Sequence, residues 1–212
     1  MIEDNIRILR QAARVKSDDE VVDDKIWCII AGNVDLIDDV AYRAIASKNS
    51  VKILFREHVV LKEGNLDKKY DFIMLYGNSR KIDEFNRVSI SRRGAAIKIS
   101  HYYINEESNL MVLVAPDDTI RDAVSIIEKS RIPFAILQES QTTGFIDVGI
   151  SDDVKLPGFV KSALKPFYKA NEVVLSTILI SVEKDKDVER VQSIATSKKI
   201  FVIDFKDIIT ED

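Results

Sequence analysis

Few residues in this sequence have the types and spacing that a reaction centre requires. The 212-residue chain has two histidines, His58 and His101, and one cysteine, Cys28. A metal site needs three or four donor side chains in a suitable geometry, and no acidic residue directly flanks His101. The single cysteine excludes a disulfide framework and a thiolate metal site. Its apolar neighbours predict a buried, inert thiol.

The acidic pairs and the glycines do not supply the missing chemistry. Asp117-Asp118 could bind a cation, but the start of a helix also explains this pair. Only Gly32 follows the first apolar run, which therefore lacks the glycine spacing of a dinucleotide-binding turn. No phosphate-binding P-loop and no G-x-S-x-G elbow occur. The sequence predicts no catalytic residue, no bound metal and no cofactor, and so a protein that is not an enzyme.

The elements that would position functional side chains alternate along the chain. Short apolar runs predict strands, and apolar residues at helical spacing predict helices between them. Continuous runs such as 72–75 and 111–114 are typical of strands that are covered on both faces. We therefore predict a mainly parallel, Rossmann-like α/β sheet with helices on both faces, followed by a smaller C-terminal α/β part. The predicted strands are 25–30, 51–60, 70–75, 96–100, 110–115, 133–138, 173–182 and 200–205, and the predicted helices are 2–16, 35–47, 81–91, 119–130, 159–168 and 186–197.

A change in composition near residue 140 predicts a domain boundary. Residues 139–144 are polar, and Pro157-Gly158 is a turn signal. We therefore predict one domain over residues 1–140 and a smaller C-terminal part over residues 141–212.

Three predicted strand ends resemble landmarks of a known family. In the DHH phosphoesterases of the RecJ superfamily, the first strand ends in H-x-D-x-D-G, a later strand ends in Asp, and a further strand ends in D-H-H. Here the corresponding stretches are Ala31-Gly32-Asn33-Val34-Asp35, Tyr76-Gly77-Asn78 and Ser100-His101-Tyr102. They occur in the family's order, and the resemblance covers residues 26–103.

The resemblance implies a metal site that has lost its ligands. The family's groups hold two metal ions, commonly manganese, which activate water for phosphodiester cleavage. Only Asp35 and His101 match the family's metal-binding residues, and two donors cannot hold two divalent ions. Hydrolysis should therefore be absent. The implied degenerate metal-site positions are Asn33, Asp35, Tyr76, Ser100 and His101.

Inactive members of this superfamily suggest a role. One is a subunit of the eukaryotic replication-fork helicase, the CMG complex, and some archaea have short RecJ-like proteins that bind the GINS complex and stimulate the MCM helicase. The chain is similar to such a short form. This implies a non-catalytic scaffold in DNA replication, with GINS and MCM as partners and with weak contact to single-stranded DNA. Residues 141–212 would then be a reduced form of the domain that follows the DHH domain, although its G-G-G-H stretch is absent.

Two alternatives remain open at this point. One is a Rossmann-like sensor of a small ligand or nucleotide, and the other is a metal-dependent phosphoesterase with an unusual metal set. A manganese titration separates the phosphoesterase from the scaffold, and a ligand screen by thermal shift tests the sensor.

A candidate partner-binding surface lies in the C-terminal part. Aromatic residues flanked by charge are typical of interface anchors. The competing interpretation is that these residues pack their helix onto the sheet. Neighbouring residues on a helix cannot easily both point inward, so either Phe167 or Tyr168 should be exposed. The candidates are Phe159, Leu164, Phe167 and Tyr168.

Charge and hydropathy limit the remaining possibilities. The formal net charge is -4 and the isoelectric point is about 5.4, which argues against a protein whose main role is to grip a phosphate backbone. No run approaches the ~18 apolar residues that a membrane span needs, and the N-terminus does not read as a signal peptide. The sequence therefore predicts a cytoplasmic protein with no membrane partner.

Overall fold

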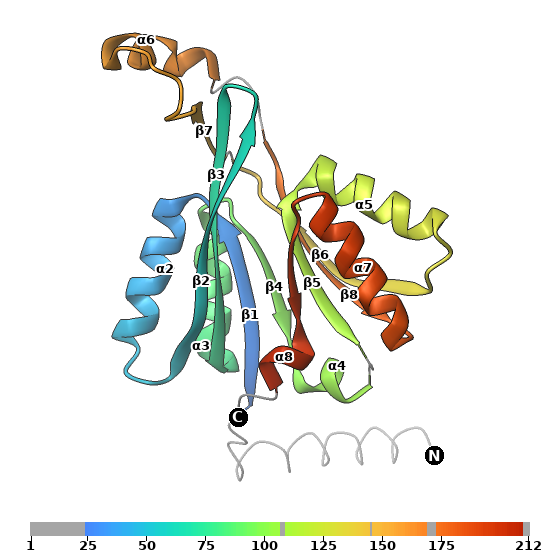
Figure 1. Ribbon diagram of the computed structural model, residues 1–212. Coiled ribbons are helices and arrows are strands. Elements are labelled where there is room, and N and C mark those ends of the chain that lie inside the picture. The colour runs from blue at the N-terminus through green and yellow to red at the C-terminus, as the bar shows by residue number, and fades with distance from the viewer. Residues whose placement is uncertain (1–23, 107–108, 145, 169–172, 210–212) are drawn as a thin grey trace, which may run out of the picture.

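A computed structural model describes residues 24–106, 109–144, 146–168 and 173–209 (Figure 1). The predicted helix over residues 2–16 lies outside this part of the chain. The other predicted helices and strands are present, with ends that shift by a few residues.

The first unit of the fold is a sheet of four consecutive strands with two helices. Its strands are in the order β2-β3-β1-β4, and all neighbours are antiparallel. This βαββαβ arrangement is the ferredoxin-like one. Its elements are β1 (Lys25–Gly32), α2 (Val34–Ala46), β2 (Val51–Glu63), β3 (Leu66–Asn78), α3 (Ser79–Ser91) and β4 (Ala95–Ile99).

The second unit repeats this arrangement. Its strands are in the order β6-β8-β5-β9, which places the first, second, third and fourth strand of the unit as in the first unit. The second strand of each unit has a register shift after its third residue, Ile53 in β2 and Ile136 in β6. The elements are β5 (Leu110–Pro116), α5 (Asp117–Lys129), β6 (Phe134–Gln141), β8 (Leu175–Val182), α7 (Asp185–Ser197) and β9 (Phe201–Asp204).

The remaining elements connect or extend the two units. α4 (His101–Glu106) lies between the units, and α8 (Phe205–Ile209) follows β9. The connection between β6 and β8 contains β7 (Asp147–Ile150) and α6 (Gly158–Tyr168). β7 pairs with residues 66–69 of β3, so the second unit adds a fifth strand to the sheet of the first. This pairing places α6 beside the tip of the β2–β3 hairpin, at the top of Figure 1.

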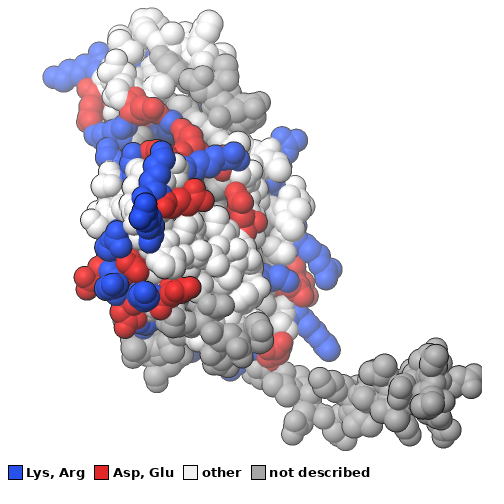
Figure 2. Space-filling view, turned by 90° about the vertical axis from the view of Figure 1, so that its right-hand side faces the viewer, with Lys and Arg blue, Asp and Glu red and all other residues white. Residues whose placement is uncertain are grey.

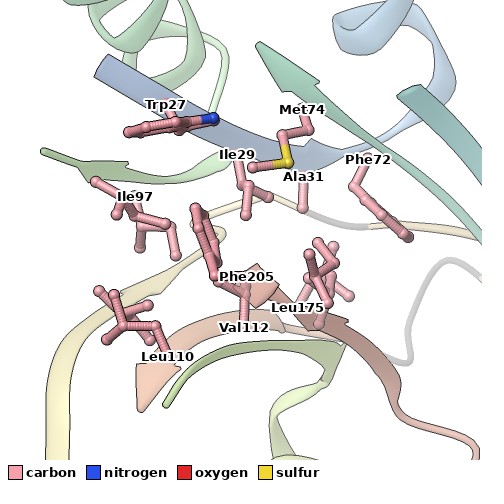
Figure 3. Close-up of a cluster of buried hydrophobic side chains, with 14 of the residues drawn as sticks. Trp27, Ile29, Ala31, Phe72, Met74, Ile97, Leu110, Val112, Leu175 and Phe205 are labelled. Carbon is pink, nitrogen blue, oxygen red and sulfur yellow. The ribbon is translucent and has the colours of Figure 1, made fainter. Parts of the chain in front are cut away.

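The two sheets pack face to face and form the centre of a four-layer structure. α2 and α3 cover the outer face of the first sheet, and α5 and α7 cover the outer face of the second (Figure 1). Between the sheets, side chains of both units point toward one another (Figure 3). This inner core includes Trp27, Ile29, Phe72, Met74, Ile97, Leu110, Val112, Leu175, Leu179 and Phe205.

The prediction of a mainly parallel sheet with helices on both faces is wrong. Every neighbouring pair of strands in both sheets is antiparallel, and the two long helices of each unit cover only the outer face of its sheet. The continuous apolar runs arise because the second face of each sheet is covered by the other sheet. Burial on both faces was predicted correctly, but it does not distinguish parallel strands covered by helices from antiparallel strands covered by another sheet.

A polar seam closes one margin between the sheets. The backbone N–H of Ala96 in β4 donates to Ser140 Oγ at 2.9 Å, and Gln138 Nε2 donates to the carbonyl of Lys98 at 2.8 Å. Residue 140 thus lies within β6, in contact with the first unit. The division into residues 1–140 and 141–212 stays a prediction.

Candidate functional site

The five degenerate metal-site positions fall into two groups at opposite ends of β1. Asn33 and Asp35 follow the C-terminal end of β1, where Asn33 caps α2 by accepting from the N–H of Leu36 at 2.9 Å. The second group is Tyr76, Ser100 and His101. Tyr76 pairs with Trp27 near the start of β1, because β3 is antiparallel to β1, and Ile99, the residue before Ser100, pairs with Trp27 from the other side. Six residues of strand separate Trp27 from Asn33, or about 20 Å. The two groups therefore do not form one cleft.

The second group joins an aromatic cluster. The Tyr76 ring lies 4.8 Å from the Trp27 ring between centroids, and the His101 ring lies 4.6 Å from it in an edge-on contact. His101 begins α4 rather than ending a strand, and the carbonyl of the preceding Ser100 accepts from the N–H of Tyr103 at 3.2 Å. The ring contacts of the histidine are thus with Trp27 and Tyr76.

A charged network that the sequence interpretation missed centres on Asp71. Asp71 lies on β3, between β1 and β2, and its carboxylate side chain is only 1% exposed. Arg56 donates to its Oδ2 from Nε at 3.0 Å and from Nη2 at 2.5 Å, and His58 Nδ1 lies 2.5 Å from Oδ1. Arg56 also donates to Asp38 of α2 at 2.7 Å. A buried carboxylate is tolerated here because both of its oxygens have charged or polar partners.

This network orients the imidazole of His58. A carboxylate can only accept, so Nδ1 donates to Asp71, and Nε2 is left on the outer part of a ring whose side chain is 52% exposed. Burial alone would lower the pKa of Arg56, but its hydrogen bonds to Asp71 and Asp38 outweigh burial and raise it. The guanidinium therefore stays charged, and the network fixes α2 to the β2–β3 hairpin.

The hairpin turn could have revealed this network. Gly64-Asn65 is a turn signal in the sequence, and Gly64 adopts a φ of 62° in a two-residue loop between Glu63 and Leu66. A two-residue loop fixes the register of the strands that it joins. Counting back from Glu63 and forward from Leu66 places His58 opposite Asp71, as observed.

The predicted partner-binding residues lie on α6, and two of them are exposed. The side chains of Phe159 and Phe167 are 77% and 73% exposed. Together with the exposed Ala163 they are spaced four residues apart, so they form one stripe along the helix. Leu164 is half-buried. The side chain of Tyr168 lies outside the described part of the structure.

The charge of α6 has one sign. The helix contains Lys161 and Lys165 and no acidic residue, and the exposed Lys155 precedes it. Figure 2 shows that the face over α5 and α7 has basic and acidic side chains interspersed, whereas the top of that view, where α6 lies, has few charges. The α6 surface is thus apolar with a basic margin.

Other features bear on chemistry more simply. Within the described ranges, no group of three or more His, Cys, Asp or Glu side chains could hold a metal ion. Cys28 is fully buried, and burial raises the pKa of its thiol to about 12, so the thiol stays protonated. In the part of the chain that the structure covers, no helix has the length and apolar character to cross a bilayer.

Comparisons with known proteins give no identity. No protein-family model matches the chain, and no curated protein does. Among solved structures, a crystal structure of an unknown protein from Galdieria sulphuraria is similar over 85% of this chain and 96% of its own, at 8% sequence identity and a TM-score of 0.29. A TM-score this low supports no argument about fold or function.

Proposed function

We propose that the protein is a non-catalytic subunit that binds a partner protein through α6. The observation that carries this proposal is the stripe of Phe159, Ala163 and Phe167. None of these residues belongs to the three buried apolar clusters of the described structure. Exposed aromatic side chains at helical spacing are the anchors by which a helix occupies an apolar groove. Phe159 and Phe167 are eight residues apart, or about 12 Å along the helix.

The chemistry of α6 defines the groove that would accept it. A stripe of aromatic rings between lysines suits an apolar groove whose rim is acidic, because complementary charge favours encounter and fixes orientation. The β7–β3 pairing supports α6 at the hairpin tip. The helix is therefore presented away from the rest of the fold.

The partner that we propose is the GINS complex of an archaeal replicative helicase, with MCM activity supported through that contact. This identity rests on the sequence resemblance over residues 26–103. The antiparallel sheets remove the parallel-strand geometry that the resemblance implied. The exposed stripe on α6 supports the contact itself, and the resemblance supports GINS as the partner.

The test is a binding measurement with a matched control. We expect Phe159→Ala with Phe167→Ala to weaken binding to purified GINS by about 1–3 kcal/mol per anchor, the range of ordinary to strong interface residues. Both side chains are exposed, so the melting temperature should change little. Tyr42→Ala is the control, because Tyr42 of α2 is 74% exposed and lies outside α6. Isothermal titration calorimetry gives the affinities.

Two results would contradict the proposal in different ways. If the wild-type chain does not associate with GINS or MCM at micromolar concentration in size-exclusion chromatography, the replication assignment fails. If it associates but the α6 variant binds as well as the Tyr42→Ala control, α6 is not the contact.

A further inference from the structure

A hollow at the start of β1 is lined only by polar and cationic side chains. It has a volume of about 440 Å³ and lies where β1 begins, β3 ends and the α2–β2 turn passes. Two other hollows of the described structure mix lysines with acidic residues. The lining residues of this one are Lys25, Lys48, Asn49, Ser50, Asn78 and Lys81.

The backbone around this hollow is held in place. The N–H of Asn78 donates to the carbonyl of Ser50 at 3.0 Å, and the N–H of Ser79 donates to the carbonyl of Asp24 at 2.9 Å. Gly77 permits this approach, because a Cβ at this position would lie 2.3 Å from the Ser50 oxygen. Three segments that are far apart in sequence thus meet at fixed positions. A ligand would find its contacts largely preorganised, which reduces the entropy lost on binding.

The charge of the hollow selects an anion. Lys48 and Lys81 contribute two ammonium groups to this hollow, in a chain whose net charge is -4. Lys81 pairs with Glu84 at 3.0 Å, but both side chains are about half-exposed, and such surface pairs contribute little and exchange readily. Asn78 Oδ1 already accepts from the N–H groups of Arg80 and Lys81. The N–H groups of Arg80 and Lys81 at the start of α3 are therefore already occupied, so a ligand would be bound by the lysine side chains.

The neighbouring aromatic pair indicates which anion. Lys25 pairs with Asn78 across the β1–β3 ladder, and Trp27 pairs with Tyr76 two residues further along the same face. The two rungs are about 7 Å apart. Tyr76 is half-buried and His101 is exposed, so part of this ring cluster is accessible. Lysines bind phosphate as point charges, and nucleobases stack on aromatic side chains.

We propose that this hollow binds the phosphate group of a nucleotide, with the base against Tyr76 and His101. The phosphate could belong to a free mononucleotide or to the end of a single strand, and the chemistry of recognition is the same for both. The proposal does not depend on the contact through α6. The lysine-lined hollow beside the ring cluster is the observation that favours a nucleotide-responsive role in addition to the scaffold role.

The single tryptophan makes the test direct. Trp27 is the one tryptophan of the chain and lies in the ring cluster. We expect adenosine 5′-monophosphate to quench its fluorescence, and inorganic phosphate to compete without quenching. Lys48→Gln with Lys81→Gln should weaken nucleotide binding roughly tenfold or more, since charge-assisted hydrogen bonds are the strong ones. Lys198→Gln with Lys199→Gln, on a mixed-charge hollow of the second unit, is the matched control and should bind as wild type.

Further binding measurements distinguish a strand end from a free nucleotide and define the results that would overturn the proposal. A (dT)5 strand with a 5′-phosphate that binds more tightly than both the mononucleotide and the same strand without the phosphate identifies a strand end. The opposite ranking identifies a free nucleotide. The proposal is overturned if nothing binds at millimolar concentration in low salt. It is also overturned if binding survives in the Lys48/Lys81 variant while both variants keep the wild-type melting temperature.

Discussion

The two βαββαβ units have the same strand order and the same register shift, but they differ at equivalent corners. In each central ladder, the last pair that faces the helices is Gly32 with Asp71 in the first unit and Ala115 with Ser176 in the second. Asp71 is a buried carboxylate held by Arg56 and His58. Ser176 instead donates from Oγ to Asp117 at 2.6 Å.

This difference shows what the shared backbone does and does not determine. The topology places a polar network where the central strands meet the first helix of the unit in both cases. The side chains then decide its chemistry: an ion cluster with an oriented imidazole in the first unit, and a hydroxyl with the half-buried carboxylate Asp117 in the second. The same backbone scheme can therefore be specialised in one copy without changing the other.

The largest expected effect tests whether the units form one cooperative structure. Phe72 of β3 is fully buried between the sheets, and its ring lies 4.5 Å from that of Phe201 in β9. We expect Phe72→Ala to lower the free energy of unfolding by about 3–5 kcal/mol. Ile178→Val, on the outer face of the second sheet, should cost about 1 kcal/mol. Urea titrations followed by Trp27 fluorescence and by circular dichroism should give coincident transitions. Separate midpoints would show that the units unfold independently.

A smaller effect distinguishes the two polar networks. Arg56→Met removes the main donor to a carboxylate that is 1% exposed, which should cost about 1–3 kcal/mol. The matched change in the second unit is Arg121→Met. Arg121 is 71% exposed and pairs with Asp117 one turn away on α5, so its loss should cost less than about 0.5 kcal/mol. If urea denaturation gives the same loss in free energy of unfolding for Arg56→Met and Arg121→Met, the two polar networks do not differ in the way described.

The smallest expected effect is a gain that both units should share. α5 is followed by Arg131 with a φ of 55°, and α3 by Arg93 with a φ of 63°. Glycine adopts this left-handed backbone without the strain that a side chain adds. Arg131→Gly and Arg93→Gly should each raise the free energy of unfolding by about 0.5–1 kcal/mol. Lys129→Gly, at the last position of α5, should lower it by about as much. A loss of stability in both turn variants would show that these arginines have contacts worth more than the strain.

The sequence predicted the elements well and their pairing poorly, for a physical reason. Periodicity reports which faces of an element are buried, and both faces are buried in these strands. It does not report whether a helix or a second sheet covers them, so the sheet direction was wrong. The error then carried to the candidate site, because antiparallel β1 and β3 bring Tyr76 to Trp27 and leave Asn33 at the other end.

Some parts of the candidate site can be predicted from residues close in sequence, and others depend on the tertiary structure. The pairing of His58 with Asp71 follows from the Gly64-Asn65 turn and needed only a count of residues. The sequence predicted that one of Phe167 and Tyr168 is exposed, and Phe167 is 73% exposed. The lysine-lined hollow could not be predicted, because its residues come from three segments that only the tertiary structure brings together.

The connection between β6 and β8 has a consequence for the order in which the protein folds. In the first unit the equivalent strands are joined by a two-residue turn, whereas in the second they are joined by 33 residues, 142–174, which include β7 and α6. Closing the longer loop costs roughly 2–3 kcal/mol more in chain entropy. The β2–β3 hairpin should therefore form early, and its edge at residues 66–69 can then capture β7 and shorten the search that β6 and β8 must complete. The helix proposed to meet a partner would thus become anchored on the first unit before the second unit is closed.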